Sequence, residues 1–174
     1  MKRRSRMRIL FLCILLLAGL LQSGCAVQDR FAHLYNDADF QGCTKPGNGI
    51  ITGRAFLKTC CSYITGRQVQ VRLVPVTPYT TARMEMRIRY ANPGEEDSRL
   101  RQYQRTTVTD NQGRFRLINI PAGDYYLTAR ICKGSSATAF NPLAQAMATR
   151  CYMAWTRVWL QTGETVDVEI KEDV

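Results

Sequence analysis

The most informative part of the sequence is DNQGRFRLINIPAGDYYLTAR, residues 110–130. It opens with a turn, because Asp110, Asn111 and Gly113 tolerate the backbone angles that tight turns require. A second turn follows at Pro121 and Gly123, since proline lacks a backbone N–H and glycine accepts unusual φ values. The stretch therefore contains two turns, each followed by a short segment that can form a strand.

Both segments alternate in the way that β-strands do. In the first, one face carries Phe115, Leu117 and Asn119, and the other carries Arg114, Arg116 and Ile118. In the second, one face carries Tyr125, Leu127 and Ala129. A short strand, a Pro-Ala-Gly turn and an aromatic strand make a hairpin-like unit of an antiparallel β domain.

The same alternation predicts strands at residues 49–58, 68–77, 100–109, 151–161 and 165–171. Residues 60–66 are predicted as a loop, and residues 79–97 as a longer excursion that holds a short strand or a helix. The chain is long enough for one full hydrophobic core. We therefore expect an all-β fold, a single antiparallel β-sandwich of about seven strands.

Three motifs, TD at 109–110, GRF at 113–115 and IPAGDY at 120–125, resemble the carboxypeptidase regulatory-like domain. The segments GRAFL at 53–57 and VQVRLVP at 69–75 are similar to the opening strands of the same family. The resemblance covers residues 50–170 and implies a prealbumin-like (transthyretin-like) sandwich. It also implies a non-catalytic domain of the kind appended to many bacterial envelope proteins.

The N-terminus has the pattern of an export signal. Five of the 24 basic residues lie within the first eight positions, and the mostly apolar residues 9–21 follow them. That segment is too short to span a membrane and suits the core of a signal peptide. The sequence Ser23-Gly24-Cys25 then resembles the lipobox of bacterial lipoproteins, with Gln22 as a departure from its pattern. Ordinary signal cleavage after Ala26 is the alternative.

These features predict three parts: a lipoprotein signal peptide at 1–24, a tether at 25–48 and the sandwich at 49–174. Lipid on Cys25 would anchor the domain to a membrane, facing the periplasm, because two or more acyl chains suffice for stable attachment. By family analogy Ala26 favours the outer membrane in a cell that has two, and secretion is the alternative. Without the first eight residues the formal charge of +10 falls to +5, too little to indicate nucleic-acid binding.

Five cysteines remain after Cys13 in the signal core and Cys25. An exported protein meets an oxidising compartment, where disulfides persist. Cys132 ends one predicted strand and Cys151 begins another, so they could close the intervening excursion; Cys43 could pair with Cys60 or Cys61. A bond between the neighbours Cys60 and Cys61 is a further option, and an odd number leaves one thiol over.

The sequence offers little for catalysis or cofactors. A hydrolytic triad needs a base, and the single histidine, His33, lies in the predicted tether. The acids Glu95, Glu96 and Asp97 lack the spacing of a calcium loop. We therefore expect no enzyme activity, no metal and no cofactor.

A binding module is the better class. Five arginines form a candidate interaction surface: Arg99, Arg101, Arg105, Arg114 and Arg116. Four tyrosines could stack on sugars or on partner side chains, or could equally fill the core: Tyr79, Tyr103, Tyr126 and Tyr152. The leading hypothesis is an envelope lipoprotein with a structural or protein-interaction domain that serves as an accessory of an envelope or secretion assembly. A carbohydrate- or peptidoglycan-binding module is the alternative, and an enzyme ranks third.

Overall fold

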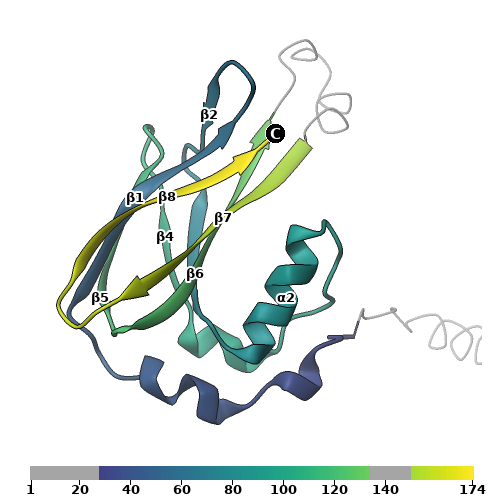
Figure 1. The fold of residues 1–174 in the computed structure, drawn as a ribbon, viewed down its shortest axis with the longest axis vertical. Helices are drawn as coiled ribbons and strands as arrows, with labels where there is room; N and C mark the ends of the chain where they lie inside the picture. The colour runs from purple at the N-terminus through teal and green to yellow at the C-terminus, as the bar shows by residue number, and fades with distance from the viewer. Residues whose placement is uncertain (1–27, 134–149) are drawn as a thin grey trace, which may run out of the picture.

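The computed structural model describes residues 28–133 and 150–174 and shows a mostly β fold (Figure 1). Eight strands curl into one mixed sheet, a half-barrel, in the order β2-β1-β8-β7-β6-β3-β4, with β5 beside β2 on the same edge of β1. The strands are β1 (Gly49–Lys58), β2 (Tyr63–Thr65), β3 (Gln70–Pro75), β4 (Arg105–Val108), β5 (Arg114–Ile120), β6 (Gly123–Lys133), β7 (Arg150–Leu160) and β8 (Thr165–Asp173). The helices are α2 (Pro78–Ile88) and the 3₁₀ segments η1 (Ala32–Leu34), η2 (Asp37–Cys43) and η3 (Ser98–Tyr103).

The first and last strands correct the expectation of a purely antiparallel sandwich. β1 and β8 pair in parallel, from Ile50 opposite Thr165 to Lys58 opposite Asp173. All other strand pairs are antiparallel. Turn motifs in the sequence predict pairing only between strands that follow each other along the chain. This pair forms instead where the first and last strands of the domain meet as the sheet curls.

The turn and strand that open the central stretch form as predicted. Asp110 Oδ1 accepts hydrogen bonds from the backbone N–H groups of Gln112 and Arg114, and Gly113 takes a φ of 76°. Along β5, Phe115 and Leu117 are buried while Arg114 and Arg116, which alternate with them, are exposed. The alternation then breaks at Asn119, which is exposed with a φ of 58°. The core position expected for it falls to Ile120, because the β1–β5 register shifts there.

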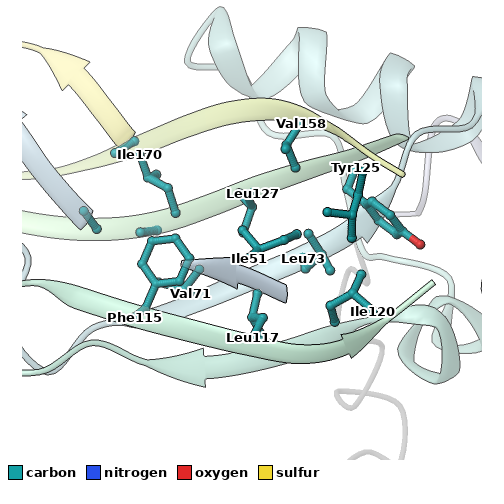
Figure 2. Close-up of a cluster of buried hydrophobic side chains, with 14 of the residues drawn as sticks. Ile51, Val71, Leu73, Phe115, Leu117, Ile120, Tyr125, Leu127, Val158 and Ile170 are labelled. Carbon is teal, nitrogen blue, oxygen red and sulfur yellow. The ribbon is translucent and has the colours of Figure 1, made fainter. Parts of the chain in front are cut away.

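The main core lies on the concave side of the half-barrel. Figure 2 shows Phe115, Leu117 and Ile120 of β5 facing Leu127, Val158 and Ile170 across it. Gly53 of β1 also faces inward, and a Cβ there would lie 2.1 Å from the Val168 carbonyl oxygen. This close approach explains why the strand carries no side chain at that position.

Helix α2 covers part of the convex side. Met84 packs there against Val74 of β3 and Tyr126 of β6, with Met153 and Trp155 of β7 at the edge of the cluster. The helix begins at a capping box in which Thr77 and Thr80 satisfy each other's backbone N–H groups. A short strand or a helix was expected within residues 79–97, and the structure has a helix there.

Two local expectations need correction. Residues 60–66 are not all loop, because they contain β2. Of the strand predicted at 100–109 only β4 forms, and η3 precedes it with Leu100 buried. Leu100 turns inward because it meets Phe40 and Tyr79 in a second small core, which local alternation cannot reveal.

Phe40 belongs to the segment expected as a tether. Its side chain is fully buried and stacks on Tyr35 and Tyr103, with ring centroids 5.3 and 4.5 Å away. Residues 28–48 therefore lie against the domain along the lower edge in Figure 1. Cys25, Ala26 and the predicted signal peptide lie outside the described residues.

Candidate functional site

An open groove of about 220 Å³ lies on the convex side of the sheet, between β2, β1 and β8. Six side chains line it: Arg54, Phe56, Lys58, Tyr63, Glu169 and Lys171. Within the described residues helix α2 packs on other strands, β3, β6 and β7, so it does not supply a lining residue.

Strand register brings these side chains together. Alternate residues of β1 point to the convex side, and on that side Arg54 lies opposite Glu169 and Phe56 opposite Lys171. On the other edge of β1, Lys58 lies opposite Tyr63. Directly opposed residues have Cβ atoms about 5 Å apart, so the three strands form one continuous surface.

Two aromatic rings give the groove its apolar part. The Tyr63 ring stands edge-on to that of Phe56, with centroids 5.3 Å apart and planes at 82°. Phe56 is buried, whereas Tyr63 remains 66% exposed. The β2 hairpin thus presents a tyrosine that rests on a fixed support and leaves most of its surface to solvent.

The remaining lining residues are charged, and cations outnumber acids by three to one. The Lys171 ammonium lies 3.1 Å from the Glu169 carboxylate. Arg54 Nε donates to the backbone carbonyl of Gln112, which holds the guanidinium against the β4–β5 turn. Such a surface can bind a polar ligand through hydrogen bonds and ring stacking. It places no nucleophile beside a base.

The five arginines predicted as an interaction surface separate into two places. Arg99 is bound to Asp97 and Asp37 and lies over the Tyr35 ring, and Arg105 donates to the carbonyls of Gln102 and Gln104. Arg101 is exposed on η3. Arg114 and Arg116 lie instead on β5, where they pair with Arg54 and Thr52 of β1 beside the groove.

The four candidate tyrosines also divide. Tyr79 and Tyr126 are buried, so these two fill cores, and Tyr103 and Tyr152 are half-buried. The exposed Tyr63 of the groove was missed. The available signal was the alternation of Arg54, Phe56 and Lys58 along one face of the predicted first strand; the pairing with β2 and β8 had no local signal.

The cysteines follow one of the expected pairings. A disulfide joins Cys132 and Cys151, which lie directly opposite each other on β6 and β7. Cys43, Cys60 and Cys61 are free thiols, so the pairing expected for Cys43 does not form. Cys43 lies instead beside Tyr125, and burial raises the pKa of its thiol. Cys60 and Cys61 are exposed in the β1–β2 turn with sulfurs 3.1 Å apart.

A second charged cluster lies under α2 and is structural. Arg83 is almost fully buried, and it donates to Asp29 Oδ1 at 2.6 Å and to the carbonyls of Gly94 and Glu95. Glu96 binds Arg72 at 2.5 Å and lies 4.0 Å from Arg87. Burial lowers the pKa of Arg87. The cluster holds the N-terminal segment and the loop after α2 against the sheet.

The described residues show neither a metal-binding group nor a membrane-spanning helix. They contain no group of three or more acidic, histidine or cysteine side chains placed to hold a metal ion. None of the helices in 28–133 and 150–174 is long and apolar enough to cross a membrane.

The fold resembles that of a proposed carbohydrate-binding protein from Pseudomonas aeruginosa. That crystal structure superimposes with a TM-score of 0.65 at 20% identity, over 84% of this chain and 99% of the other. At this identity the similarity concerns the fold. A minor pilin of Streptococcus agalactiae matches at a TM-score of 0.37 and 15% identity, over 74% of this chain and 45% of the pilin. No family model and no curated protein matches the sequence.

Proposed function

We propose that the protein is a non-catalytic carbohydrate-binding domain whose ligand lies in the groove between β2, β1 and β8. The observation that carries the proposal is Tyr63, 66% exposed and supported edge-on by the buried Phe56. An exposed aromatic ring on a rigid strand can stack on the apolar C–H face of a sugar and loses little conformational entropy in doing so.

The polar rim supports the same class of ligand. Arg54, Lys58 and Glu169 can donate to or accept from sugar hydroxyl groups on either side of the ring. The groove is smaller than the roughly 300–1,000 Å³ of pockets that enclose whole ligands. It therefore suits one residue of a longer glycan that continues over the sheet. The related fold of the Pseudomonas aeruginosa protein is consistent with this class.

The export signal and Cys25 lead us to place this domain in the cell envelope, attached to a membrane by lipid. A glycan of that compartment would then be its ligand. The protein-interaction role expected first from the sequence is the competing proposal, and it predicts a stoichiometric protein partner rather than a glycan.

Binding of the purified protein to an array of immobilised oligosaccharides tests the proposal. We expect Tyr63→Ala to weaken binding of the recognised glycan about tenfold, as for loss of one stacked ring. Tyr90→Ala is the matched control, because Tyr90 is also exposed but does not line the groove. Melting curves of both variants verify that they are folded.

Absence of binding across the array would refute the proposal, and so would equal binding by Tyr63→Ala and the unaltered protein. Recovery of one stoichiometric protein after crosslinking in cells, lost on Tyr63→Ala, would establish the competing role.

A further inference from the structure

Basic side chains extend beyond the groove across three adjacent strands. Lys171 of β8, Arg54 and Lys58 of β1, and Arg114 and Arg116 of β5 all lie on the convex side, and we call these five residues the basic strip. Neighbouring strands are about 4.8 Å apart and alternate residues along a strand about 6.8 Å. The backbone positions of neighbouring cations in the strip are therefore about 5 to 7 Å apart.

The strip is poorly neutralised by the protein itself. Of its five residues, only Lys171 has a carboxylate within ion-pair distance among the described residues, that of Glu169. The nearby Asp167 accepts a hydrogen bond of 2.8 Å from the Thr52 hydroxyl. Glu169 and Asp173 of β8 lie opposite Arg54 and Lys58 in the register, beyond ion-pair distance. Arg54 is held by the Gln112 carbonyl. Within the described residues, Lys58, Arg114 and Arg116 therefore remain without a bound acceptor and can meet a ligand.

The register places two of these cations side by side, and Glu169 on the other side of Arg54 offsets only part of their repulsion. Arg54 and Arg114 are direct partners across β1 and β5. Like charges in directly opposed positions of a sheet destabilise it. An anionic ligand lying across both strands would remove this repulsion, so binding of an anion is favoured twice: by attraction and by relief of the repulsion.

From these relationships we propose that the ligand is an acidic polysaccharide with a carboxylate on successive sugar residues, a polyuronate. The inference rests on the proposed function, because Tyr63 stacks on one sugar ring. Lys58 and Lys171 bind the carboxylate of that residue, and Arg54, Arg114 and Arg116 bind those of the residues that follow. Phe56 is buried at the base of the groove. A flat bilayer surface would not reach it, whereas a single sugar chain can enter.

Calorimetric titration of the purified protein with hexagalacturonate tests the inference, with its methyl ester as the uncharged match. We expect the free acid to bind at least about tenfold more tightly than the ester, and the difference to shrink in about 0.5 M NaCl as charges are screened. The neutral chitohexaose and vesicles of phosphatidylglycerol are titrated in parallel.

Two variants locate the binding. Arg116 lies outside the groove but within the basic strip. Arg116→Gln should therefore lower the affinity for hexagalacturonate about threefold, as for one exposed charge pair, and leave the affinity for digalacturonate unchanged. Arg89 is an exposed cation at the end of α2 and has no carboxylate partner among the described residues. Arg89→Gln should therefore change neither affinity.

The outcomes separate the two proposals. Equal binding of the acid and the ester, or binding of chitohexaose alone, would overturn the inference and leave the carbohydrate-binding function standing. Binding of the vesicles without any oligosaccharide would overturn both, and so would no binding at all to the oligosaccharides, the array included.

Discussion

The guanidinium of Arg83 lies 2.6 Å from the carboxylate of Asp29, 54 residues earlier in the chain. Asp29 also accepts a hydrogen bond of 2.6 Å from the Tyr79 hydroxyl. Both partners come from α2, and both are buried. We call these three residues the Asp29 clamp. It fixes the start of the described N-terminal segment to the helix, so that η1 and η2 lie against the domain.

Loss of the clamp should destabilise the protein. We expect Asp29→Asn to lower the free energy of unfolding by about 3 kcal/mol, because the buried Arg83 loses its closest carboxylate and keeps only Glu96, 3.9 Å away. Asp39→Asn removes an exposed carboxylate from the same segment and should cost less than about 0.5 kcal/mol. Urea denaturation measures both. Equal stability of the two variants would mean that the clamp contributes nothing.

Tyr79 should make the protein sensitive to alkali. Burial, aided by the hydrogen bond to Asp29, raises the pKa of Tyr79 to about 12, against about 10 in an unfolded chain. The folded state thus holds this proton more tightly. Its contribution is complete below about pH 10 and is lost as the pH rises through about 12.

The near-ultraviolet absorbance of tyrosinate, compared between the unaltered protein and Tyr79→Phe, isolates this group. We expect the difference between the two titrations to show one tyrosine ionising at about pH 12. Ionisation near pH 10 while the protein is still folded would contradict the prediction.

The disulfide between Cys132 and Cys151 should be the main covalent stabiliser. The two residues are separated by 19 positions, and closing a loop of that size contributes about 3 kcal/mol in the chain-entropy model. Replacing both by serine should therefore lower the free energy of unfolding by about that amount. The same change at Cys60 and Cys61, which are exposed free thiols, should have little effect. A free Cys132 in a peptide map made without reduction would disprove the bond.

Lipidation at Cys25 has its own consequence. The Asp29 clamp leaves only residues 26–28 between the proposed anchor and the folded domain. A spacer of that length reaches at most about 14 Å, so the domain would stay at the membrane surface. We expect Cys25→Ser to move the protein to the soluble fraction of cell lysates, with Cys60→Ser as the control. Unchanged membrane retention of Cys25→Ser would exclude this anchor.

Local sequence patterns predicted much of the sheet. The strand predicted at 49–58 is β1, and the strands predicted at 151–161 and 165–171 correspond to β7 and β8. These predictions were correct because alternation directly reflects a strand with one face buried. The predictions for residues 60–66 and 100–109 were wrong because β2 has only three residues and η3 turns Leu100 into a core built from distant segments.

Sequence patterns predicted the candidate site less well than the strands. Arg114 and Arg116 were singled out as basic, but so were Arg99 and Arg105, which are engaged by groups of their own neighbourhood. Composition cannot tell a cation that faces a ligand from one that is already bound. Tyr126 of β6 is buried because helix α2 covers that part of the sheet. Tyr79 belongs to α2 itself and is buried against Phe40 of the N-terminal segment and Leu100.

The sequence by itself determined the mostly β character, the faces of its longer strands and the cysteine pair that closes one hairpin. These depend on the period of side chains along a strand and on residues that turns require. Tertiary structure alone decided that β1 and β8 run in parallel, that Tyr63 meets Phe56 beside Lys171, and that Asp29 reaches Arg83. Such contacts arise from which strand edges and helix faces remain free as the sheet curls, and no local pattern encodes that choice.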